Sequence, residues 1–208
     1  MEIKVVGYNK KIQGHNVLTD INLTLNSGHI YSFVGRNGSG KTMLLRAISG
    51  LILPTDGEVY VDDQKLGKDL SFPNDTGIFI DEPRYLSYLT GFENLQMLAE
   101  IRKKISDEQI KEWMEKLLLP INKLKFRKYS AGMKQKVGII QALMEEPKLL
   151  ILDEPFNTLD EESVIILKDI LIKFKQQGAL IIITSHNKED HEQLSDQIFE
   201  IKNGILIN

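Results

Sequence analysis

The chain of 208 residues contains no cysteine, which excludes disulfide bonds and thiolate metal sites. Long apolar runs are missing too. The longest, at 179–183, is far shorter than the about 20 residues that a membrane-spanning helix needs. The first residues also lack the basic start and apolar stretch of a signal peptide. We therefore expect a cytoplasmic chain that does not itself cross a membrane.

An excess of positive charge is also lacking, because 26 Lys and Arg stand against 29 Asp and Glu, for a formal net charge of −3. Basic and acidic residues are interspersed, so the chain shows no basic footprint of the kind that phosphate backbones require. This pattern disfavours a nucleic-acid partner. The hydrophobic fraction of 42% is ordinary for one globular domain with a single core.

Short apolar runs of strand length alternate with helical stretches, which predicts an α/β fold. Strands are predicted at 3–8, 21–25, 30–34, 58–61, 77–80, 149–152 and 180–184. The last three are typical of strands buried on both faces of a parallel sheet. Apolar residues at helical spacing predict a helical insert at 92–128. An Asn-Gly pair at 203–204 predicts a terminal hairpin of 198–201 and 205–207.

The segment GRNGSGKT occupies residues 35–42, between a predicted strand and a predicted helix. Its glycines let the backbone turn sharply and point several N–H groups inward at a helix N-terminus, where phosphates bind. A lysine at 41 reaches the β- and γ-phosphates, and a threonine hydroxyl at 42 binds Mg²⁺. The full match to G-x-x-x-x-G-K-[ST] predicts a nucleotide site made by Gly35, Arg36, Asn37, Gly38, Ser39, Gly40, Lys41 and Thr42.

A second motif, KLLILDEP at 148–155, is a predicted buried strand that ends in two adjacent carboxylates. Asp153 is expected to hold Mg²⁺ through its water shell, and Glu154 to polarise an attacking water molecule. Phosphoryl transfer to water needs these two roles. A strand ending in Asp-Glu-Pro is by itself often only a turn, but the phosphate loop favours the functional interpretation.

The third motif, YSAGMKQK at 129–136, opens a predicted helix that Ser130 can cap and in which Gly132 allows close approach. With these motifs in this order, the chain resembles the nucleotide-binding subunit of ATP-binding-cassette (ABC) transporters over essentially its whole length. Residues 129–133 stand where that family has its Leu-Ser-Gly-Gly-Gln signature. The third position carries Ala131 instead of glycine, and Met133 replaces the glutamine.

The resemblance implies a single ABC ATPase domain over 1–208, with a RecA-like P-loop core, an antiparallel β subdomain and a helical subdomain at about 90–145. It implies ATP and Mg²⁺ as ligands and a homodimer or pseudo-dimer in the ATP-bound state. In that dimer the signature residues Ser130, Ala131, Gly132 and Met133 of one subunit contact ATP held by the other. It also implies a separate integral membrane permease, and thus a peripheral location on the cytoplasmic face of the membrane.

Individual roles follow by matching position. The resemblance assigns Glu154 as catalytic base, His186 as the switch histidine that senses the γ-phosphate, and Asp160 to the D-loop at the dimer seam. Tyr8 fits the adenine-stacking aromatic better than Tyr31, which should be buried in a strand. Core packing is the alternative for Tyr8.

The Q-loop departs further from the family pattern. Counting back from LTGFEN at 89–94 places Asp81 where the family usually has glutamine. Its carboxylate could offer an oxygen to Mg²⁺, and Glu82 could do so instead if the register slips by one residue. An acidic residue here resembles the lantibiotic-immunity and bacteriocin-export subunits. Together with the absence of a regulatory domain after the hairpin, it favours an exporter.

An aromatic and aliphatic cluster follows at Tyr85, Leu86, Tyr88 and Leu89. Such a cluster is usually core, and the family alternative is a groove that receives a helix of the permease. Both interpretations stand at this point.

A cassette that works in a soluble complex, of the cluster-assembly or repair type, is the alternative to a transporter subunit. Repair ATPases need a long heptad insert, and fewer than about 90 residues separate the phosphate loop from the signature here. Ribosome-acting relatives normally join two cassettes, whereas this chain holds one.

Overall fold

The computed structural model describes residues 1–81, 84–185 and 194–207. The elements in chain order are β1 (Glu2–Ile12), β2 (His15–Asn26), β3 (Ile30–Val34), α1 (Lys41–Ile48), β4 (Asp56–Val61), β5 (Gln64–Lys65), β6 (Thr76–Phe79), α2 (Gly91–Arg102), α3 (Asp107–Lys116), η1 (Phe126–Lys128), α4 (Ala131–Leu143), β7 (Leu149–Leu152), α5 (Glu161–Gln176), β8 (Leu180–Ser185), β9 (Gln197–Lys202) and β10 (Ile205–Ile207).

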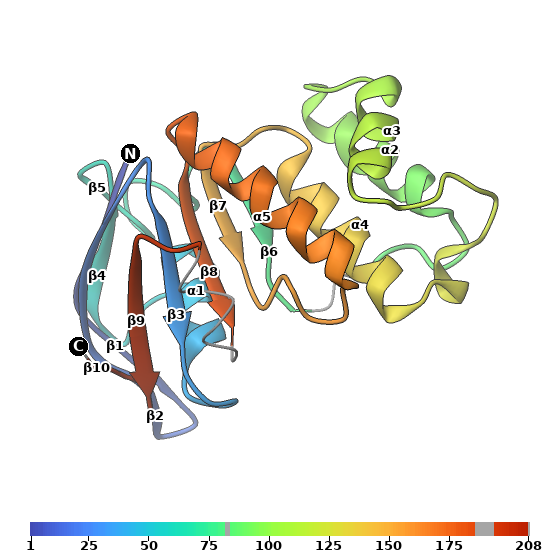
Figure 1. Ribbon diagram of the computed structural model, residues 1–208. Helices are drawn as coiled ribbons and strands as arrows, with labels where there is room; N and C mark the ends of the chain where they lie inside the picture. The colour runs from blue at the N-terminus through green and yellow to red at the C-terminus, as the bar shows by residue number, and fades with distance from the viewer. Residues whose placement is uncertain (82–83, 186–193, 208) are drawn as a thin grey trace.

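These strands form two sheets (Figure 1). The first has the order β2-β1-β4-β5 and is antiparallel, and the second has the order β10-β9-β3-β8-β7-β6. The second sheet is parallel from β9 to β6, and β10 joins it antiparallel to β9. The predicted α/β fold with an antiparallel β part and a P-loop core is therefore confirmed, and β3, β7 and β10 begin and end at the predicted residues.

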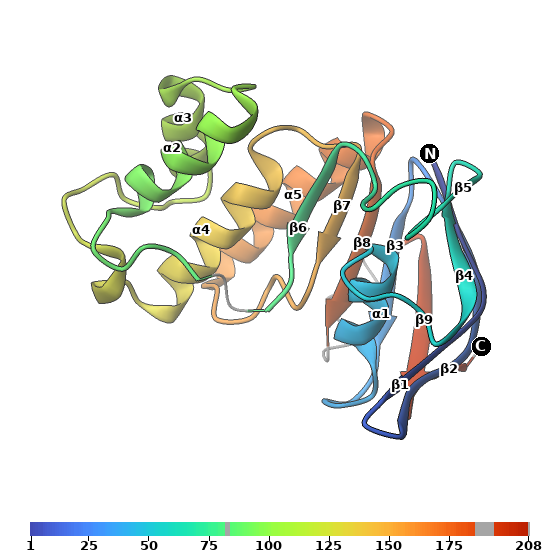
Figure 2. The same cartoon turned by 180° about the vertical axis from the view of Figure 1, so that it is seen from behind.

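The central strands bury side chains on both faces, because successive residues point to opposite sides of a sheet. In β7, Leu149 and Ile151 pack with α1 and the antiparallel sheet, whereas Leu150 and Leu152 pack with the helices on the other face. Figure 2 shows α1 lying between the two sheets, and Figure 1 shows α5 crossing the opposite face of the parallel sheet. The continuous apolar runs of the sequence reflect this burial on both faces.

The helices α2 and α3 lie at the end of the molecule farthest from the antiparallel sheet (Figure 1). Each begins with a capping box, made by Thr90 with Glu93 in α2 and by Ser106 with Gln109 in α3. These reciprocal bonds satisfy backbone groups that a helix start leaves open. In the part of the chain that the structure describes, no helix has both the length and the apolar character that crossing a bilayer requires.

Helix α4 approaches β6 closely at Gly77. A Cβ atom added to Gly77 would lie 1.9 Å from the carbonyl oxygen of Ala142 in α4 and 2.8 Å from Pro147 Cγ. Only glycine therefore allows this helix to lie so near the strand.

We predict that Gly77→Ala destabilises the fold by about 3 kcal/mol, because the obstacle is helix backbone, which cannot move aside as a side chain can. Gly178→Ala is the control. Its added Cβ meets nothing within 4 Å and φ is +91°, so only the backbone conformation is penalised, by about 1 kcal/mol. Urea unfolding followed by circular dichroism measures both. Equal midpoints for the two variants would contradict the close approach.

Candidate functional site

The candidate site lies where the carboxyl ends of β3, β8 and β7 meet. The strands are parallel and in register, with Val34 opposite Ser185 and Leu152 opposite Ile183. The phosphate loop follows β3, and the two acidic residues follow β7. Because the carboxyl ends of parallel strands share one edge of the sheet, motifs more than a hundred residues apart in sequence come together.

Two glycines shape the phosphate loop. Gly40 has a φ of +112°, and a Cβ at Gly35 would lie 2.3 Å from the carbonyl oxygen of Ile201. Gly40 is the N-cap of α1, and no side chain of the described residues makes a cap bond there. The first-turn N–H groups of α1 are thus left for an anion, which the positive end of the helix also favours.

The phosphate loop is tied to its surroundings through the turn of the β9–β10 hairpin. Gly204 N–H donates to the carbonyl oxygen of Ser39 at 2.7 Å. The carbonyl of Gly204 in turn accepts from Thr19 N–H of β2 at 2.8 Å. The loop is therefore fixed to both sheets.

Lys41 is buried, with 5% of its surface exposed. Its ammonium donates to the carbonyl oxygens of Gly35 at 2.8 Å and Arg36 at 3.4 Å, and lies 3.5 Å from Glu154 Oε1. These oxygens compensate the cost of burying the charge. The ammonium thus lies over the phosphate loop, where it can meet an incoming phosphate.

Asp153 connects the two motifs. Thr42 Oγ1 donates to Asp153 Oδ2 at 2.6 Å, and Thr184 Oγ1 of β8 donates to Asp153 Oδ1. A hydroxyl and a carboxylate therefore lie side by side. Both are oxygen ligands of the kind that Mg²⁺ prefers.

Glu154 has an unusual backbone conformation, with a φ of +47°. Its N–H donates to Thr184 Oγ1 at 2.9 Å, and its carbonyl oxygen accepts from Gln135 Nε2 at 3.0 Å. Asn157 Nδ2 donates to its Oε2. Neighbouring elements thus hold the conformation that directs this carboxylate toward Lys41.

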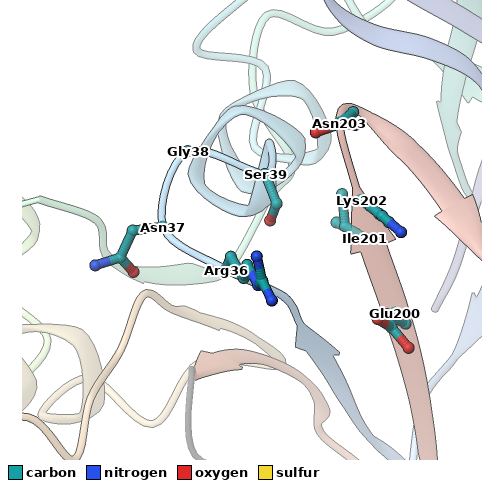
Figure 3. A pocket seen from close by; sticks show the side chains of 8 residues that line it. All are labelled: Arg36, Asn37, Gly38, Ser39, Glu200, Ile201, Lys202 and Asn203. Atoms are coloured by element: carbon teal, nitrogen blue, oxygen red, sulfur yellow. The ribbon is translucent and has the colours of Figure 1, made fainter.

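Two clefts flank the phosphate loop. One of about 590 Å³ is lined by Asn16, Val17, Asn37, Gly38, Gly40, Lys41, Thr42, Met43, Glu154, Asn203 and Gly204. The other, of about 440 Å³, lies between the loop and the end of β9, and in Figure 3 Asn37 points away from that strand. Only the larger cleft contains Lys41, Thr42 and Glu154. The larger cleft is therefore the candidate site.

The signature segment opens α4 away from this cleft. Ser130 is the N-cap and accepts from Met133 N–H at 3.2 Å, and both Ser130 and Ala131 are exposed. A Cβ on Gly132 would lie 2.7 Å from the carbonyl oxygen of Thr158. The described residues that line the larger cleft include none from 129–133.

Asp160 is the N-cap of α5. Its carboxylate accepts from the hydroxyl and the backbone N–H of Ser163, and Lys136 of α4 lies 3.3 Å away. These hydrogen bonds, above all that from the Ser163 hydroxyl, lower the pKa of Asp160 to about 2. The predicted D-loop residue is therefore charged and exposed, and also has a local capping role.

The predicted role of Tyr8 in adenine stacking is not compatible with the structure, because the side chain is 0% exposed. Ile3 and Val5 of β1 point into the core, and strict alternation would place Gly7 there next. Gly7 instead has a φ of +53°, and the pairing with β2 shifts between Val5 and Tyr8. This bulge turns the Tyr8 ring into the core, where burial raises its pKa to about 12.

The carboxylate of Asp81 forms an ion pair with Arg46 of α1. Its role as a metal ligand therefore stays a prediction that this contact does not support. Its alternative, Glu82, and the predicted switch residue His186 both lie outside the described residues.

The aromatic cluster divides in two. Tyr85 packs edge-on against Phe126, and its hydroxyl donates to Gln141 Oε1 at 2.5 Å. Burial raises the pKa of Tyr85. Tyr88 is 63% exposed, and Leu86 is also exposed. Core packing thus describes Tyr85, and a surface role remains open to Tyr88.

Sequence reasoning missed several residues at the site. Asn16 and Val17 of β2 line the cleft because β2 lies beside the hairpin turn, and Gln135 and Asn157 hold Glu154. Periodicity gives no signal for these contacts. The Asn-Gly turn was recognised as a hairpin, but its proximity to the phosphate loop depends on β9 lying next to β3.

Several known proteins are similar in sequence to this chain. An uncharacterized ABC transporter ATP-binding protein of Bacillus subtilis (strain 168), YybJ, is 45% identical over 98% of this chain and 94% of its own length. The bacitracin transport ATP-binding protein BcrA of Enterococcus faecalis is 39% identical over 92% of this chain, which spans 63% of that relative. The lantibiotic transport ATP-binding protein SrtF of Streptococcus pyogenes is 31% identical over 99% of this chain and 89% of its own.

Among solved structures, one described as an ATP-binding subunit of an ABC transporter superposes with a TM-score of 0.87 at 26% identity, covering 99% of this chain and 88% of that one. The family model for ABC transporters matches residues 18–157. The phosphate loop, the acidic strand end and the helix that Ser130 caps thus occur in the fold of these subunits, and the chain belongs to the ABC transporter family as an ATP-binding subunit.

Proposed function

We propose that two copies of this chain, or one copy and a similar partner, close on ATP and drive export through a separate membrane permease. The proposal rests on one observation: within one chain, the start of α4 lies apart from the cleft that contains Lys41. The cleft holds Lys41, Thr42 and Glu154, whereas the exposed start of α4 lies outside it. A second copy can bring its α4 start to the open side of the cleft, where the helix N-terminus favours phosphate.

The chain's own residues then have distinct tasks. The N–H groups at the start of α1 and the Lys41 ammonium bind the phosphates, and Glu154 takes a proton from water. The water oxygen forms a bond to the γ-phosphorus, and the bond from that phosphorus to the β-γ bridging oxygen breaks, leaving ADP and phosphate. Because Lys41 lies near Glu154 Oε1 in this structure, phosphate binding must draw the ammonium away before that oxygen can accept the proton.

Mg²⁺ fits the pair of Thr42 and Asp153. Their oxygens are 2.6 Å apart, and Thr184 fixes the second carboxylate oxygen. When bound, the ion supplies positive charge that neutralises the β- and γ-phosphate oxygens.

Export is supported by the relatives and by the surface near α2. Two of the relatives are described as transport ATP-binding proteins for bacitracin and for lantibiotics, which favours a peptide-exporting system. Tyr88 and Leu86 are exposed in the segment before α2. This surface suits a helix of the permease and gives the chain a peripheral place on the cytoplasmic face of the membrane. A cassette in a soluble complex remains the alternative.

ATP-dependent dimerisation can be tested with a variant of Glu154. Glu154→Gln should bind ATP without turning it over, so the closed dimer should accumulate. Size-exclusion chromatography with light scattering should show a shift from monomer to dimer with Mg·ATP and none without nucleotide.

The control for dimerisation adds Ser130→Asp to Glu154→Gln. Aspartate caps a helix as well as serine does, so α4 should stay folded. Its charge should repel the γ-phosphate of the opposite subunit and abolish the shift, while ATP binding to each monomer persists. Dimer formation by the double variant would contradict the trans contact of the signature.

A further prediction concerns the exposed side chain of Tyr88. Tyr88→Asp should reduce the fraction of tagged chain recovered with membranes of the native host by about tenfold, because a buried charge without a partner disfavours an apolar contact. ATP binding should not change. Ile165→Asp, at an α5 side chain that is 57% exposed, is the control and should remain with the membranes. Membrane recovery of Tyr88→Asp equal to that of the wild type would contradict this docking surface. A wild-type chain found only with soluble partners would favour a cassette in a soluble complex.

A further inference from the structure

Asn157 contacts Glu154 through both its backbone and its side chain. In the loop after β7, Asn157 N–H donates to the carbonyl oxygen of Glu154 at 3.2 Å. The side-chain Nδ2 donates to Glu154 Oε2. The other carboxylate oxygen, Oε1, lies 3.5 Å from Lys41 Nζ. The two oxygens of one carboxylate therefore have partners of different chemistry, a neutral amide and an ammonium.

These two partners respond differently to a nucleotide. Phosphate oxygens compete for the Lys41 ammonium, because charge-assisted bonds to phosphate are strong. The Asn157 amide carries no charge, and its backbone bond to Glu154 holds it in the same turn. We therefore expect nucleotide binding to release Oε1 toward the cleft and to leave Oε2 in place.

The backbone of Glu154 is already fixed by neighbouring elements. Its N–H bonds to Thr184 of β8, and its carbonyl oxygen accepts from Gln135 of α4. The side chain of glutamate is long and flexible, so contacts of its own must orient the carboxylate. The hydrogen bond from Asn157 to Oε2 restricts the rotation of that side chain.

We propose that Asn157 is a positioning residue for ATP hydrolysis, which holds Glu154 Oε2 so that Oε1 faces the attacking water. The inference rests on the proposed role of Glu154 as the base. It assigns to the loop between β7 and α5 a task within its own subunit, before any contact with a partner. The side chain acts through Glu154 and does not itself touch the nucleotide.

The test compares two variants of the full chain by kcat and KM for ATP, at a protein concentration where dimers form. Asn157→Ala removes the amide and should lower kcat by about tenfold, as loss of a supporting hydrogen bond typically does, with KM changed less than about twofold. The thermal unfolding midpoint, measured beside it, shows whether the fold is kept.

Asn157→Asp keeps the shape of the side chain and replaces the donor by a carboxylate. Two carboxylates this close raise the pKa of one of them. Below that raised pKa the pair shares one proton, which can bridge the two carboxylates, and above it both groups are charged and repel. The ratio of variant to wild-type kcat should therefore rise as the pH falls. A residue that merely supports the loop would not give this profile.

Gln64→Glu is the matched control, because it makes the same amide-to-acid change at an exposed residue of β5. Its kcat, KM and pH profile should match the wild type. Wild-type kcat in both Asn157 variants, or a loss without pH dependence of the ratio, would overturn the inference. Glu154→Gln separates the two proposals. Wild-type turnover in Glu154→Gln would contradict the role of Glu154 as the base. Loss of turnover in Glu154→Gln, together with wild-type turnover in both Asn157 variants, would contradict only the positioning role of Asn157.

Discussion

The carboxylate of Asp153 is held between two hydroxyls, one on the helix after the phosphate loop and one on β8. This short chain of hydrogen bonds depends on the register of β3, β8 and β7. Because side chains alternate along a strand, a slip of one residue would turn the carboxylate to the other face of the sheet. The apolar packing that sets the register therefore also determines where the carboxylates of Asp153 and Glu154 lie.

The sheet can hold that register because its central strands are buried on both faces. Leu150 and Leu152 anchor the side that carries α4 and α5, and Leu149 and Ile151 anchor the side that carries α1. The helix that follows the phosphate loop and the helix that carries the signature thus pack on opposite faces of one strand. Displacing either helix changes the packing around the acidic residues at the end of that strand.

The strands, the phosphate loop and the cap at Ser130 could be predicted because they depend on local patterns. Burial periodicity, turn residues and motif spacing each involve few neighbouring residues. The position of Tyr8 could not be predicted in this way, because a bulge at Gly7 changes which face each later residue occupies.

The hydrogen-bond and ion-pair partners of the charged residues could not be predicted from the sequence either. Asp81 pairs with Arg46, which lies 35 residues earlier, and no pattern in either segment indicates the other. Gln135 reaches Glu154 only because α4 packs beside the end of β7. Such contacts depend on the tertiary arrangement, which local spacing does not contain.

The bond between Gly204 and Ser39 links the far hairpin to the phosphate loop, and Gly204 is itself bonded to Thr19. A glycine-rich loop without such links would sample many conformations and lose that freedom whenever a nucleotide bound. In this chain the phosphate loop has already lost that conformational freedom on folding. The loop is preorganised, so more of the interaction energy with the phosphates is available as affinity, and the terminal hairpin contributes to nucleotide binding through rigidity.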